Sequence, residues 1–170
     1  MSNLLRISDS PPPNQASKRI GRAADNISAE HGIDFHEAIR EHTEWRRKFC
    51  CAISTHQSLE VASISQDSAC ALGKWLRDDA WQAYRGLDGY LPCLDAHSAF
   101  HLEAAKVARA IDDKSFYEAR LMLASGSDYS KAAIALGIAI TLLMKAANLS
   151  KPRRQISPRF PLAALRTTSP

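Results

Sequence analysis

Apolar residues recur at steps of three and four along residues 35–56, and this repeat is the strongest constraint on the fold. The repeating positions are Phe35, Ala38, His42, Trp45, Phe49, Ala52 and His56. Such spacing places one side chain per turn on a single face, which predicts an amphipathic helix beginning near Asp34. His42 and His56 are therefore expected on the buried side of this helix.

A shorter helical pattern follows. Asp67 or Ser68 is a suitable N-cap for a short helix that runs through Leu76, with Cys70 in its first turn. Residues 57–66 show no clear pattern. A thiol at the start of a helix is expected to have a lowered pKa, because the backbone N–H groups there favour the thiolate.

The second half of the chain predicts three more helices. One spans about 91–111, a second about 115–124, and a third begins at Ser127 or Asp128. The last helix carries two apolar stripes, formed by Tyr129, Ala133, Leu136, Ile140, Leu143 and Ala147 and by Ile134, Ile138 and Thr141. A helix that is apolar on two sides is central or shared with a partner chain, so we expect a homodimer surface there.

Together these patterns predict an all-α fold, an antiparallel helical bundle of four main helices plus a short helix that carries Cys70. Few stretches alternate with period two, so no strand is expected. The 170 residues and 45% hydrophobic composition suit one domain, placed at 31–150. Residues 1–30 are expected to form a disordered leader, and residues 151–170 a basic disordered tail.

The net charge of +4 is unevenly distributed. The tail contains five basic residues and no acid, whereas the predicted domain is slightly acidic, so nucleic-acid binding is not expected of the domain. No run of 18 apolar residues and no signal-peptide layout are found, which favours a cytoplasmic protein without a membrane span. Cytoplasmic cysteines are core residues, redox groups or metal ligands; Cys50, Cys51 and Cys93 are interpreted as small core residues.

His97 and His101 lie four residues apart on a predicted helix, so both imidazoles project from one face and can bind one ion. The same spacing also occurs in histidines that are mere neighbours on a polar face. His42 can equally be a core histidine that is hydrogen-bonded to the backbone. With Cys70, however, the three histidines form a complete set of three nitrogens and one sulfur, which suits Zn²⁺. Nearby acids (Glu41, Glu44, Asp95 and Glu103) are either orienting partners of the imidazoles or solvated helix charges.

Three segments resemble the chemoreceptor zinc-binding (CZB) domain family. They are His42 with Trp45, the element Cys70-Ala71-Leu72-Gly73-Lys74-Trp75, and His97-Ser98-Ala99-Phe100-His101. The resemblance covers about residues 32–149. It implies that His42, Cys70, His97 and His101 bind zinc, that Gly73 and Trp75 serve the packing of the motif, and that the bundle dimerises. Family members usually adjoin chemoreceptor or diguanylate cyclase modules, which this chain lacks.

An enzyme is not expected. Hydrolytic zinc needs an open coordination position, which four protein ligands leave closed, and no glutamate follows His97 as in metalloproteases. The segment around His42 and Cys93 imitates half of the nucleobase deaminase signature. The second cysteine of that signature is replaced by Ala96.

The function expected from these features is zinc or oxidant sensing through a zinc–thiolate switch at Cys70, responsive to hypochlorous acid or a similar oxidant. Such a switch would serve chemotaxis or cyclic-di-GMP signalling through a chemoreceptor or diguanylate cyclase partner. The alternative is a helical adaptor with structural zinc, whose basic tail (151–170) binds an acidic partner.

Overall fold

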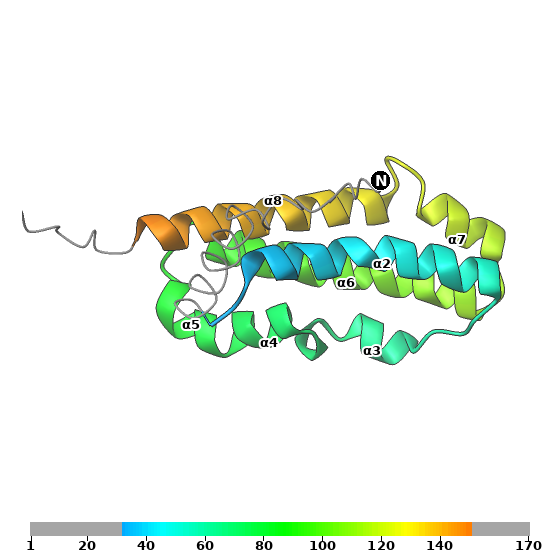
Figure 1. The fold of residues 1–170 in the computed structure, drawn as a ribbon, viewed down its shortest axis with the longest axis horizontal. Coiled ribbons are helices and arrows are strands. Elements are labelled where there is room, and N and C mark those ends of the chain that lie inside the picture. The colour runs from blue at the N-terminus through cyan, green and yellow to red at the C-terminus, as the bar shows by residue number, and fades with distance from the viewer. Residues whose placement is uncertain (1–31, 151–170) are drawn as a thin grey trace, which may run out of the picture.

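The described part of the chain consists of three long helices, an interrupted column of short helices and one further short helix (Figure 1). The computed structural model describes residues 32–150. Its elements are α2 (Phe35–Thr55), α3 (Val61–Ser65), the 3-10 helix η1 (Asp67–Ala69), α4 (Ala71–Arg77), α5 (Asp79–Tyr84), α6 (Tyr90–Asp112), α7 (Phe116–Met122) and α8 (Asp128–Leu149). The all-α antiparallel bundle expected from the sequence is thus confirmed.

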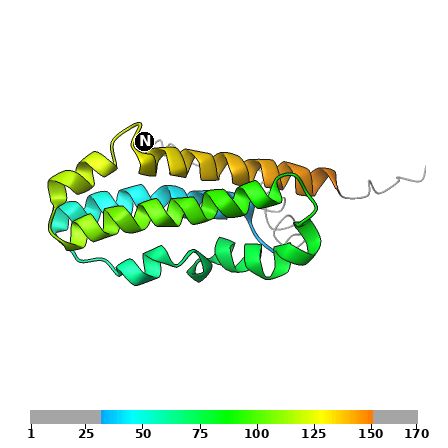
Figure 2. The ribbon, with the colours of Figure 1, turned by 180° about the vertical axis from the view of Figure 1, so that it is seen from behind.

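Helices α2 and α6 run in the same direction, and α8 and the column α3–η1–α4–α5 return in the opposite one (Figure 1). Figure 2 shows α6 between α8 and the column, and α6 packs against both α8 and α3. The fourth side of the bundle is therefore built from short pieces in place of one continuous helix. Its breaks matter for the site, because Cys70 lies at one of them.

Helix α2 begins as its sequence predicts. The Asp34 side chain accepts hydrogen bonds from the backbone N–H groups of His36 and Glu37, which satisfies donors that a helix start leaves unpaired. His42 is buried on its inner face. The expectation that His56 is buried was wrong: its φ of 53° ends the helix, and its exposed ring stacks on Phe116 with centroids 4.5 Å apart.

The core runs the length of α6 between the other helices. Its largest fully buried side chains include Phe35, Phe49, Leu72, Leu76, Phe100, Ile111, Leu136, Ile140 and Leu143. Burying each such side chain contributes about 1.5–3 kcal/mol, so the bundle can hold polar ligands in its interior without losing its packing. Polar side chains inside this core are few among residues 32–150: His42, His97 and His101.

Helix α8 differs between its two faces. Its inner stripe is buried, whereas Ile134, Ile138 and Leu142 remain 62%, 56% and 52% exposed. By length and composition alone α8 could also cross a membrane, with 28% of its most apolar window buried in the bundle. The absence of a membrane span therefore stays a prediction. The leader (1–30) and the tail (151–170) lie outside the described residues.

Candidate metal centre

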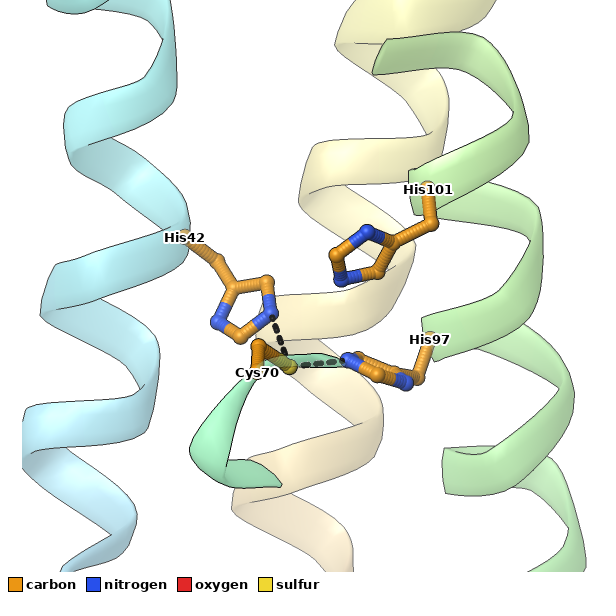
Figure 3. Close-up of side chains that lie close together, drawn as sticks. All are labelled: His42, Cys70, His97 and His101. Carbon is orange, nitrogen blue, oxygen red and sulfur yellow. Dashed lines mark hydrogen bonds between the residues drawn. The ribbon is translucent and has the colours of Figure 1, made fainter. Parts of the chain in front are cut away.

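The four residues singled out in the sequence meet inside the bundle (Figure 3). His42 comes from α2, Cys70 from the start of α4, and His97 and His101 from α6. One donor atom from each lies within 4.8 Å of all the others. The Cys70 sulfur is 3.1 Å from Nε2 of His97 and 3.9 Å from Nε2 of His42. Three segments that are far apart in the sequence thus converge on one point.

Cys70 is positioned by a break in the backbone. The sequence predicted that Asp67 or Ser68 caps the helix and that Cys70 lies in its first turn; instead, Cys70 itself is the N-cap. Its extended backbone (φ −82°, ψ 162°) turns the thiol into the bundle, and the sulfur accepts the backbone N–H of Gly73 at 3.3 Å. Asp67 begins the 3-10 helix that precedes this break.

Gly73 and Trp75 pack this segment against the rest of the bundle. A Cβ atom at Gly73 would lie 1.7 Å from the backbone carbonyl oxygen of Asp67 and 2.9 Å from Cε1 of His97, so only glycine fits. Trp75 is 4% exposed and meets Phe35 edge-on, with ring centroids 5.4 Å apart. The Cys-x-x-Gly-x-Trp element therefore holds the cysteine close to α6.

Backbone carbonyls orient two of the imidazoles. Nδ1 of His42 donates to the carbonyl of Ala38, and Nδ1 of His101 donates to the carbonyl of Ile64, both at 2.7 Å. In a neutral ring this leaves Nε2 with a free lone pair, which is the form that binds a metal. Within the described chain, Nε2 of His101 is buried and has no hydrogen-bond partner. A buried acceptor without a partner is costly, and a metal ion would satisfy it.

Burial favours the neutral form of His97 and His42. It lowers the pKa of His97 to about 3, aided by the nearby His101 and His42, and it is also the main cause of the lowered pKa of His42. Burial raises the pKa of the Cys70 thiol, although the backbone N–H groups of Gly73 and Leu72 act in the opposite direction. The expectation that the helix start lowers the pKa of Cys70 was therefore wrong. A bound cation would deprotonate the thiol.

The donor set fits a metal ion. Three imidazoles and one thiol supply three nitrogens and one sulfur, donor types that tetrahedral zinc sites use. The unpartnered Nε2 of His101 and the two rings fixed by carbonyls support the same conclusion. The cluster is therefore able to hold a metal ion.

Two of the four acids considered in the sequence, Glu44 and Glu103, take other roles. Glu44 pairs with Arg47 at 2.5 Å and Glu103 with Lys106 at 2.6 Å, so these two are helix charges on the bundle surface. The ring-orienting groups are instead the carbonyls of Ala38 and Ile64, which sequence patterns do not reveal. The contact that sequence reasoning missed is the side chain of Asp67, which accepts a hydrogen bond from Ser98.

The remaining cysteines do not share one environment. Cys93 is completely buried on α6, as expected, and burial raises its pKa to about 12. Cys50 and Cys51 are exposed on α2, so their interpretation as core residues was wrong. They lie off the buried face of that helix.

Comparisons with protein-family models, with curated proteins and with solved structures find no match to this chain.

Proposed function

We propose that this chain is a zinc-binding sensory or regulatory domain of the CZB type, in which Cys70 acts as a redox switch. The observation that carries the proposal is the convergence of the three imidazoles and one thiol within 4.8 Å, on otherwise apolar helix faces. Burying three histidines together is unfavourable unless their polar atoms find partners, and a bound metal ion would be such a partner. The sequence resemblance of the same residues to the CZB family supports the identity of the metal as zinc.

His42, Cys70, His97 and His101 would hold the ion. When bound, zinc supplies a charge that keeps the Cys70 sulfur as thiolate, and a link between segments worth on the order of 10 kcal/mol in binding free energy. His42 and His101 present Nε2 because their Nδ1 atoms donate to backbone carbonyls. Cys70 ties the short column to α2 and α6, so metal binding favours the closed bundle.

Exposure makes Cys70 the ligand that an oxidant would meet first. His42, His97 and His101 are 6%, 0% and 3% exposed, whereas Cys70 is half-buried. A thiolate attacks the chlorine of hypochlorous acid, which forms an S–Cl bond and releases hydroxide. Water then replaces chloride and releases a proton, which gives sulfenic acid; sulfur has lost two electrons and chlorine has gained them. Loss of the thiolate would free the column from α6.

A partner on α8 would carry the change onward. The exposed side chains of Ile134, Ile138 and Leu142 line an apolar groove together with Ile39 of α2 and Gly137 of α8. Exposed apolar patches of this kind mark interaction surfaces. We propose a second copy of the chain as the occupant, and a chemoreceptor or diguanylate cyclase pathway as the output. Cytoplasmic location and a non-enzymatic role belong to the same proposal.

Metal analysis of the purified full chain tests the proposal. We expect close to one zinc per chain in the wild type, a large loss in Cys70→Ala, and no change in Cys50→Ser, which alters an exposed cysteine outside the cluster. Wild-type zinc content in Cys70→Ala would contradict the ligand set.

The redox step needs its own experiment. Zinc release is followed with a chromogenic chelator while hypochlorous acid is added to wild type and to Cys70→Asp, whose carboxylate is a zinc ligand without a thiol. We expect oxidant-dependent release in the wild type alone. Equal release from both proteins would show that Cys70 oxidation is not the trigger.

A further inference from the structure

Asp67 connects the segment that carries Cys70 to the rest of the bundle. Its carboxylate oxygen Oδ2 accepts a hydrogen bond from the hydroxyl of Ser98 and another from the guanidinium of Arg77 at 2.5 Å. Ser98 follows His97 on α6, and Arg77 lies in the last turn of α4. A single carboxylate thus joins η1, α4 and α6 beside the metal ligands.

The backbone of Asp67 also touches the cluster. The thiol of Cys70 donates to its carbonyl oxygen at 3.6 Å, and the same carbonyl occupies the space where a Cβ of residue 73 would lie. A displacement of Asp67 therefore changes the position of Cys70 relative to Nε2 of His97, which is 3.1 Å away.

Helix α4 is anchored by the buried side chains of Leu72, Trp75 and Leu76, whereas none of the three residues of η1 is buried. The 3-10 helix η1 is three residues long and has no side-chain hydrogen bond at its start. The Asp67 side chain is 19% exposed, and Arg77 is 43% exposed. Hydrogen bonds to a partly buried carboxylate are stronger than those between neutral groups in water, so these two contacts tie η1 to α4 and α6.

We propose that Asp67, together with Ser98 and Arg77, is a positioning residue that controls how often Cys70 leaves the cluster. These three residues are called the Asp67 latch. The latch sets the rate at which the site exchanges metal and the rate at which the thiol becomes accessible. The first consequence rests on the proposed function; the second concerns the protein with or without a metal.

The test uses the full chain with Cys50→Ser and Cys51→Ser, so that Cys70 is the accessible thiol while Cys93 stays buried. Two rates are measured: alkylation of Cys70 by iodoacetamide in chelator-treated protein, and transfer of zinc to a chromogenic chelator from loaded protein. We expect Asp67→Ala and Ser98→Ala each to raise both rates about tenfold, the lower range for losing a hydrogen bond to a charged group. Unchanged alkylation would overturn the proposal.

Three controls separate the latch from general destabilisation. Ser98→Thr keeps the hydroxyl and should retain rates close to wild type. Glu103→Gln breaks the ion pair between Glu103 and Lys106. The Glu103 side chain is 19% exposed, as that of Asp67 is, and this variant should leave both rates unchanged. Ile111→Val removes one fully buried methyl group near the end of α6 and so lowers core stability away from the cluster. An equal rate increase in Ile111→Val would show that the latch variants act through global stability, and would overturn the proposal.

A double variant tests whether the partners act together. Asp67→Ala should add little to Ser98→Ala if both remove the same contact. Fully multiplicative rate increases would contradict a shared latch. Failure of the proposed function is recognised separately: a wild type that takes up no zinc refutes the metal proposal, whereas the alkylation rates still decide the role of Asp67.

Discussion

The histidine ligands and the cysteine ligand are held by two different kinds of structure. His42, His97 and His101 project from α2 and α6, long helices with buried faces. Cys70 stands between the three-residue η1 and the seven-residue α4. Packing over many turns fixes the imidazoles, whereas a few local contacts fix the thiol.

In the proposed function, this difference would separate metal binding from the redox response. Three fixed imidazoles on long helices define where a cation binds, because their positions are set by the core. The thiol lies between η1, which has no buried residue, and α4, which is only seven residues long. Short segments with little buried area open at lower free energy than core helices. The proposed redox group, the Cys70 thiol, therefore lies at the shortest of the three helices that carry the four residues.

The largest effect is expected where the thiol segment meets α6. Gly73→Ala would bring a Cβ to 1.7 Å from the backbone oxygen of Asp67. A backbone atom cannot move aside as the end of a flexible side chain can. We expect the free energy of unfolding to fall by about 3 kcal/mol and metal uptake to be lost, as in strong overpacking. Urea denaturation and metal analysis measure the two quantities.

Helix α8 offers a matched control for that substitution. A Cβ atom at Gly137 would meet no other part of the described chain within 4 Å. Gly137→Ala should therefore raise the free energy of unfolding by about 0.5–1 kcal/mol, because alanine favours the helix. If Gly73→Ala were as benign as Gly137→Ala, the close approach of Asp67 to α4 would be wrong.

Metal removal should affect the two regions unequally. After treatment with a chelator, we expect amide hydrogen exchange to accelerate about tenfold or more in residues 67–77, with a smaller change in the middle of α2 and α6. The physical reason is that the column loses its tie through Cys70, while the long helices keep their core contacts. Equal acceleration of amide exchange in all helices would show that the Cys70 segment depends on the metal no more than α2 and α6 do.

The last prediction concerns Cys93, a buried thiol on the long helix α6, whose effect on the free energy of unfolding appears only above neutral pH. Cys93 lies one turn before His97, and burial raises its pKa from 9.0 to about 12. Because the unfolded chain releases this proton at lower pH, the thiol's contribution is complete below pH 9 and is lost as pH rises toward 12. We expect the free energy of unfolding to fall by about 1 kcal/mol between pH 9 and 10.

Cys93→Ala provides the comparison for that prediction. This variant should show a flatter pH dependence over the same interval, measured by denaturant unfolding at each pH. An identical slope in both proteins would mean that Cys93 is not the group responsible.

Periodicity predicted the long helices and the buried face of His42 because apolar spacing directly encodes helix orientation. The spacing of His97 and His101 likewise placed both rings on one side of α6. The three histidines stood out as candidate ligands because they interrupt otherwise apolar faces, and the resemblance to the CZB family supported Cys70 as the fourth member of the expected set. Convergence of Cys70 with them depended on tertiary packing, which spacing alone left open.

Other features had no sequence signal strong enough to find them. At the break, the sulfur of Cys70 accepts the N–H of Gly73. Cys70 is therefore the N-cap of α4, in place of the predicted Asp67 or Ser68. The rings of His42 and His101 are oriented by backbone carbonyls, which every residue carries. The raised pKa of Cys70 follows from burial, and burial of a short segment cannot be read from its own residues.

The central claim is that three imidazoles and one thiolate hold a zinc ion. X-ray absorption at the zinc edge of the loaded full chain tests it most directly. We predict one sulfur neighbour at about 2.3 Å and three nitrogen neighbours at about 2.0–2.1 Å, with the sulfur neighbour lost in Cys70→Ala. A wild-type spectrum with no sulfur neighbour, or with five or six oxygen and nitrogen neighbours, would contradict the account.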